Sequence, residues 1–133
     1  MTKLGIISAA ALASTVALAS PVFADWTELG EDLDGNTFYI EYDTLKENNG
    51  LIYYWRLQDY LKPEESGYLS SKVLTEVDCD IPRKYRSLSY VFYKQPMAGG
   101  NGDTYSRASE WRDPMPDGGS EVTINKVCDY AGK

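Results

Sequence analysis

The sequence predicts an α+β fold, in which an antiparallel β-sheet of about six strands carries one C-terminal helix on one face. Several segments alternate polar and apolar residues with the period of a strand, and one segment near the C-terminus has apolar residues at helical spacing. The chain also holds two cysteines, Cys79 at the end of a strand-like segment and Cys128 on the helical stripe. A bond between them would tether the helix to the sheet.

The first 24 residues have the features of a signal peptide. Lys3 supplies a positive n-region, residues 4–18 are apolar or small, and Val22-Phe23-Ala24 offers a cleavage site. This apolar run is too short for a stable transmembrane helix, so a retained N-terminal anchor is the weaker alternative. We expect a mature chain from Asp25 to Lys133: one exported domain, periplasmic or secreted, without stable membrane insertion. No cysteine lies near the cleavage site, so we expect no lipid anchor at the new N-terminus.

The acidic charge balance argues against nucleic acid as a partner. The whole chain has a net charge of −7, and loss of Lys3 with the leader makes the mature charge −8. Such a surface repels phosphate backbones. We therefore expect a protein partner, and a monomer or a weak homo-oligomer in solution.

Turn residues divide the mature chain into strands. We predict strands at 26–29, 37–41, 51–61, 68–79, 83–93 and 104–111. Asp34-Gly35 and Asn48-Asn49-Gly50 predict tight turns, because glycine adopts positive φ freely. Asp43-Thr44 can cap one brief helical turn, and the glycines of Lys94 to Asp103 predict a mobile hairpin loop.

The C-terminal helix and the central strand each carry one cysteine on an apolar face. Ser120 is a candidate N-cap, and the spacing of Ile124, Val127, Cys128 and Ala131 marks an amphipathic helix. Period two puts Cys79 on the face of its strand that carries Val73 and Val77. Two cysteines in an exported chain are expected to pair. Closing a loop of about 50 residues would stabilise the fold by roughly 4 kcal/mol.

The segment Arg83-Lys84-Tyr85-Arg86 is the one basic cluster in this acidic chain. We take Arg83, Lys84 and Arg86 as candidate contacts for a partner. Strict alternation puts Lys84, Arg86 and Tyr90 on one face of the strand and Arg83 on the other. The alternative is a charged strand end that opposes the carboxylates of the preceding turn.

Catalysis is not expected. The chain contains no histidine, and both cysteines are predicted to be paired, so no catalytic, metal or cofactor residue is assigned. Haem held by tyrosine or methionine is disfavoured for the same lack of histidine. The remaining enzymatic alternative is a carboxylate pair, since Asp78 and Asp80 flank Cys79 on one strand face about 7 Å apart.

An ordered series of short motifs resembles a known family. The series runs Trp26, Phe38-Tyr39-Ile40 with Asp43-Thr44, Tyr54-Trp55, Ser71-Lys72, Asp78-Cys79, Arg86-Ser87-Leu88, a glycine-rich loop, Trp111, Pro116 with Ser120, and Val127-Cys128. It resembles the surface-adhesin protein E-like domain family of bacterial exported proteins. The resemblance covers nearly all of Asp25 to Tyr130. It implies the same sheet and helix, with Cys79 and Cys128 joined.

The resemblance also implies a role. Members that gave the family its name act as surface adhesins for host extracellular proteins, so we expect a non-enzymatic binding module that recognises extracellular or envelope proteins. The eleven tyrosines of the chain suit such recognition, because tyrosine combines an apolar ring with a polar tip. The alternative is a periplasmic structural or envelope-stress protein with no surface adhesion.

Overall fold

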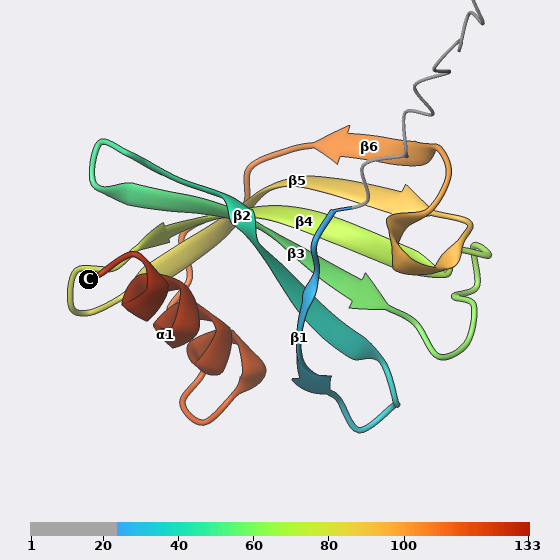
Figure 1. Cartoon of the computed structure of the whole chain (residues 1–133), viewed down its shortest axis with the longest axis horizontal. Coiled ribbons are helices and arrows are strands. Elements are labelled where there is room, and N and C mark those ends of the chain that lie inside the picture. The colour runs from blue at the N-terminus through green and yellow to red at the C-terminus, as the bar shows by residue number, and fades with distance from the viewer. Residues whose placement is uncertain (1–23) are drawn as a thin grey trace, which may run out of the picture.

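Six antiparallel strands and one α-helix make up the described part of the chain (Figure 1). The computed structural model describes residues 24–133, so the predicted leader lies outside the described residues except for Ala24. Each strand pairs with its neighbour in the chain, in the order β1-β2-β3-β4-β5-β6. The elements are β1 (Thr27–Glu31), β2 (Thr37–Asn48), β3 (Leu51–Asp59), β4 (Ser70–Asp78), β5 (Lys84–Tyr93), the 3₁₀ turn η1 (Pro96–Ala98), β6 (Gly102–Ser106) and α1 (Gly119–Tyr130). The predicted fold class is confirmed.

The core lies between α1 and one face of the sheet. Its buried members are Ile40, Ile52, Tyr54, Val77, Cys79, Ile124, Val127 and Cys128. Full burial of one aliphatic side chain of this kind contributes about 1.5–3 kcal/mol. The predicted disulfide is present, with the Cα atoms of Cys79 and Cys128 5.8 Å apart. Figure 1 shows α1 over one half of the sheet, while no α-helix of residues 24–133 lies over the other half.

Strand β2 is longer than predicted, and the helical turn expected at Asp43-Thr44 is wrong. The strand continues to Asn48 and turns at Asn49 and Gly50, which have φ values of 53° and 81°. The register with β3 shifts between Glu41 and Lys46. Asp43 and Thr44 therefore lie in a bulge of the strand and not in a helical turn. The Thr44 hydroxyl donates a hydrogen bond to the Glu41 carboxylate at 2.9 Å rather than capping a helix.

The glycine-rich loop after β5 is fastened to the sheet. The amides of Met97 and Ala98 donate hydrogen bonds to Asp59 at 2.8 Å and to Ser70 Oγ at 2.9 Å. The Ser70 hydroxyl in turn donates to the Gln95 carbonyl at 2.6 Å. These bonds were not predicted from the glycine content. The last strand, β6, begins at Gly102 and ends at Ser106, earlier than the predicted 104–111.

A bulge in β5 exchanges the faces of its two halves. The register with β4 shifts between Leu74 and Thr75, which leaves Leu88 without a partner on β4. One additional residue reverses the face to which every following side chain points. Arg86, which precedes the bulge, lies on the face away from α1 and pairs with Glu76. Tyr90 lies on the face that α1 partly covers, where it lines a cavity together with residues of the helix.

Candidate functional site

The first member of the predicted basic cluster, Arg83, is engaged within the fold. Its Nε donates to the Cys79 carbonyl at 3.2 Å, and a terminal nitrogen donates to the Asn125 side-chain oxygen at 2.7 Å. The second terminal nitrogen donates to the Lys133 carbonyl at 3.4 Å. Arg83 thus joins the β4–β5 turn to α1 and to the C-terminus.

Arg86 is also engaged, by a buried acid. Its guanidinium lies 3.3 Å from both carboxylate oxygens of Glu76, whose side chain is only 4% exposed. The same guanidinium lies 4.8 Å from the ring centroid of Trp111, a favourable cation–π distance. Arg86 is therefore the ion-pair partner of the buried Glu76, and the fold needs it in this role.

The remaining two candidates lie apart. Lys84 is exposed at the start of β5, on the same face as Arg86. Tyr90 is on the opposite face, so the predicted common face of Lys84, Arg86 and Tyr90 is wrong. The reason is the bulge at Leu88, which interrupts the strict alternation on which that prediction depended.

Four aromatic side chains lie together on the half of the sheet that α1 leaves uncovered. The Phe92 ring centroid lies 5.3 Å from that of Tyr68 and 6.3 Å from that of Tyr90. The Tyr105 ring meets Phe92 edge-on at 5.8 Å. Tyr105 is on the edge strand β6 and is 56% exposed. We call Tyr68, Tyr90, Phe92 and Tyr105 the aromatic band.

Polar contacts hold the Tyr68 ring of the aromatic band in place. The Tyr68 hydroxyl donates to the Asp103 carboxylate at 2.6 Å, and the Lys94 ammonium lies 4.7 Å from the Tyr68 ring centroid. The hydrogen bond to Asp103, together with desolvation, raises the pKa of Tyr68 to about 12. Tyr68 is therefore a neutral donor near pH 7, and its ring is held in place on the surface.

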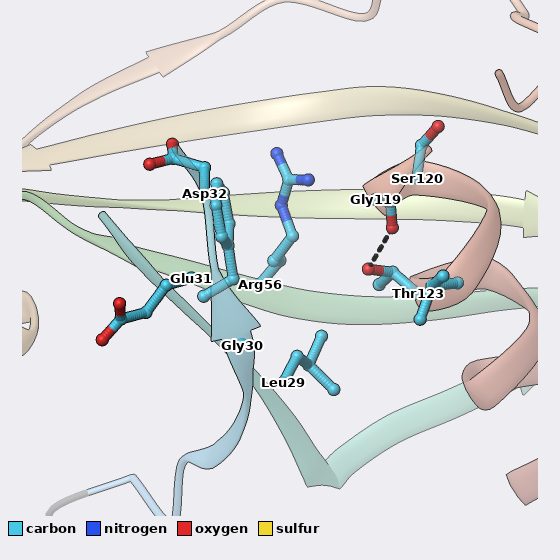
Figure 2. Close-up of a pocket in the computed structure, with 10 residues that line it drawn as sticks. Leu29, Gly30, Glu31, Asp32, Arg56, Gly119, Ser120 and Thr123 are labelled. Atoms are coloured by element: carbon cyan, nitrogen blue, oxygen red, sulfur yellow. Dashed lines mark hydrogen bonds between the residues drawn. The ribbon is translucent and has the colours of Figure 1, made fainter. Parts of the chain in front are cut away.

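A cavity of about 310 Å³ opens between β1 and the first turn of α1 (Figure 2). In Figure 2 the Arg56 side chain lies between β1 on one side and Ser120 and Thr123 on the other. The Arg56 guanidinium is 5.5 Å from the centroid of the Phe38 ring. The cavity is lined by Leu29, Gly30, Glu31, Asp32, Phe38, Arg56, Gly119, Ser120, Val122 and Thr123.

The acids of this cavity do not neutralise Arg56. Neither ion pair formed by residues 24–133 involves Arg56. Asp32 belongs to the β1–β2 turn, where its carboxylate accepts the amides of Asp34 at 2.9 Å and Asn36 at 3.0 Å. Desolvation opposes ionisation of this carboxyl, but the hydrogen bonds from the turn outweigh it and lower the pKa of Asp32.

A second, smaller cavity of about 110 Å³ lies between the first turns of α1 and the sheet. It shares Arg56, Ser120 and Thr123 with the first cavity. Its lining is polar except for one side chain and contains no carboxylate: Tyr54, Arg56, Thr75, Tyr85, Ser87, Tyr90, Arg112, Ser120, Thr123 and Ile124. Burial raises the pKa of Tyr54 to about 12 although Arg56 acts against it, so this hydroxyl stays neutral.

The chemistry available at these surfaces is that of binding. Within residues 24–133 no group of three or more His, Cys, Asp or Glu side chains is placed to hold a metal ion. No helix in the described part of the chain has the length and apolarity needed to cross a membrane. Exposed aromatic rings and guanidinium groups without acidic partners are features of recognition surfaces.

Comparison with known families gives a match over most of the chain. The family described as surface-adhesin protein E matches residues 26–129. The chain belongs to the surface-adhesin protein E family. This confirms the resemblance drawn from the ordered motifs. Neither the curated proteins nor the solved structures compared with the chain match it. Membership of the surface-adhesin protein E family implies an exported, adhesin-like protein with a non-enzymatic role, and leaves its partner unnamed.

Sequence reasoning missed two parts of this surface-adhesin protein E domain. The first is Arg56, which alternation alone places on the face of Ile52 and Tyr54, where α1 packs. The sequence does not show that the helix covers only half of that face. Arg56 therefore borders the larger cavity at the N-terminal end of α1. The second is the aromatic band, because its rings come from three segments that only the sheet register brings together.

Proposed function

We propose that this protein is an exported, non-enzymatic binding module that recognises an extracellular or envelope protein through the aromatic band. The observation that carries the proposal is a set of four packed rings on the uncovered half of the sheet, with Tyr105 56% exposed. Aromatic side chains supply large contact areas at low entropic cost, and they are enriched at the centres of interfaces.

We propose the basic cluster as a second contact region. Lys84 is its exposed member, Arg83 adds positive charge at the same end of β5, and the charge of Arg86 beside them is offset by Glu76. An acidic partner would gain mainly in association rate from these charges, and salt would weaken the effect. Tyr90 belongs to the aromatic band and contributes from the opposite face of the strand.

Binding to a panel of purified extracellular-matrix proteins, measured by biolayer interferometry, tests the proposal. Tyr105→Thr removes the most exposed ring of the band and keeps a β-branched residue in the edge strand. We expect a loss of tenfold or more in affinity for any matrix protein that binds, as for a residue at the centre of an interface.

Tyr130→Thr is the matched control, because Tyr130 is 59% exposed but lies at the end of α1, away from the band. Equal losses in both variants would refute the role of the band. Lys84→Glu tests the basic cluster alone, since Arg86→Glu would put a second carboxylate beside the buried Glu76. Fractionation of the native cells distinguishes an adhesin from a periplasmic structural protein, which would be absent from the cell surface.

A further inference from the structure

Arg56 is a cation held in place without an anion. It projects from the middle of β3 toward the first turn of α1, and its guanidinium stacks on the Phe38 ring, 5.5 Å from the ring centroid. Neither ion pair of the described residues includes it. A guanidinium kept in one position by stacking loses little further freedom when it binds a planar anion.

The smaller cavity beside Arg56 is suited to a negatively charged group. Arg112 lines it from the segment before α1, and no acidic side chain lines it. Ser120 accepts a hydrogen bond from the Met115 amide at 3.3 Å, which leaves its hydroxyl proton as a donor. Thr123 uses its own hydroxyl proton on the Gly119 carbonyl at 2.8 Å. The two guanidinium groups and the Ser120 hydroxyl are thus among the donors that remain to bind an anion.

The larger cavity limits what else the ligand can be. Leu29, Phe38 and Val122 give it an apolar wall, and its volume of about 310 Å³ is at the lower end of the range of ligand pockets. Glu31 and Asp32 also line it, and they repel a multiply charged anion such as a phosphate more strongly than a singly charged one. A single negative charge attached to an apolar body satisfies both cavities.

From these observations we infer that the two cavities form one binding site for a carboxylate attached to an apolar group. The carboxylate binds Arg56 and Arg112 in the smaller cavity, and the apolar group packs against Leu29, Phe38 and Val122 in the larger one. Two sources present this chemistry: a free carboxylic acid, and the C-terminal residue of a peptide. The inference does not rest on the proposed function. Of the aromatic band only Tyr90 borders the smaller cavity, and Tyr105, whose replacement tests the band, lines neither cavity.

Isothermal titration calorimetry of the mature protein with paired probes tests the site. The probes are 3-phenylpropionate with its neutral amide, and a tetrapeptide ending in phenylalanine with a free or an amidated C-terminus. We expect at least one acid to bind at least tenfold more tightly than its amide, because bidentate guanidinium–carboxylate pairing is lost in the amide. The probe that binds identifies the source. Equal affinity for acid and amide, or no saturable binding of either acid up to about 10 mM, overturns the inference.

Variants assign the binding to the two arginines. Arg56→Gln and Arg112→Gln should each weaken acid binding by tenfold or more, whereas Arg107→Gln, an exposed arginine outside both cavities, should leave it unchanged. A circular dichroism melt checks that each variant is folded, and Arg112→Gln decides the matter if Arg56→Gln does not fold, since Arg112 is exposed. Wild-type affinity in a folded arginine variant contradicts the assignment.

Discussion

Arginine residues in this protein have two kinds of surroundings. Arg83 donates to carbonyls and an amide oxygen, and Arg86 pairs with a buried carboxylate although its own Nε is buried without a hydrogen-bond partner among the described residues. Arg56 meets an aromatic ring and open space. Of the basic residues that stand together in the sequence, the two arginines are therefore engaged within the fold and only Lys84 is exposed without an ion-pair partner among the described residues.

Replacing the half-buried Arg86 should destabilise the protein, because the residue pairs with a buried acid. Arg86→Met leaves the Glu76 carboxylate buried without its partner, and breaking a buried pair from one side costs about 3 kcal/mol. Urea unfolding at pH 7 measures this loss. Lys84→Met, which removes a charge from the same strand without a buried partner, should stay within about 0.5 kcal/mol of wild type. Equal midpoints for the two variants would contradict the structural role of Arg86.

Alkaline titration should detect the bond between Tyr68 and Asp103. The raised pKa of Tyr68, about 12, means that its contribution to stability is present below its ordinary value of 10.0 and is lost as the pH rises through 12. Ultraviolet absorbance of the tyrosinates follows this ionisation. Asp103→Asn removes the accepting carboxylate and should move one tyrosine of late titration to lower pH, while Tyr54 stays late because of its burial. An unchanged titration curve in Asp103→Asn would disprove this assignment.

At the scale of single residues, the sequence predicted which side chains are charged but not which groups contact each charge. Glu76 stands on a strand whose alternation places it on the solvent side, yet it is 3% exposed. Glu76 is paired with Arg86, and the Arg86 guanidinium in turn lies against the ring of Trp111, which follows β6 far along the chain. Period-two patterning describes one strand at a time, so it contains no information on such neighbours.

Among the elements, the edge strand β6 depends on a close approach at Gly102. A Cβ built on Gly102 would overlap the Val91 side chain and lie 2.8 Å from Tyr93 Cε1. Gly102→Ala should therefore cost about 1–3 kcal/mol through overpacking. Hydrogen exchange should show faster exchange of the β6 amides. Gly119→Ala is the control: nothing lies within 4 Å of its Cβ, and alanine favours the helix. Protection of β6 equal to wild type in Gly102→Ala would contradict the packing.

The disulfide should hold α1 on the sheet. Cys128→Ser reopens a loop with a sequence separation of 49 residues and should lower stability by about 2–5 kcal/mol. Hydrogen exchange of the variant should detect opening of α1 at lower denaturant than opening of β3 and β4. Cys79→Ser should give the same loss, since both changes remove the same bond. Alkylation of two free thiols in wild-type protein would refute the bond itself.

Element existence and order were predictable because hydrophobic periodicity and turn residues are local signals. The six strands, the helix and the cysteine pair follow from them. The bulges of β2 and β5 were not predictable, since an additional residue in one strand is defined only by the partner it fails to match. The bulge at Leu88 in β5 is the reason that Tyr90 was predicted on the wrong face of its strand.

For the whole molecule, processing is the first prediction to test. We expect the mature protein to begin at Asp25 and to be a monomer or weakly associated. Intact-mass spectrometry of protein from the native cells checks the first claim, and sedimentation velocity checks the second. A mass that includes residues 1–24 would refute cleavage, and a stable oligomer at micromolar concentration would refute weak association.

The order of the strands also sets the order in which the cysteines meet an oxidant. Every ladder of the sheet joins chain neighbours, so hairpins can close one after another as the polypeptide emerges from a translocation pore. Cys79 emerges with β4, whereas Cys128 follows 49 residues later on α1. During that interval Cys79 has no intramolecular partner, and disulfide exchange proceeds through a mixed disulfide. We therefore expect an oxidase to capture Cys79 first, and the arrival of Cys128 on the helix to release that enzyme as the disulfide forms.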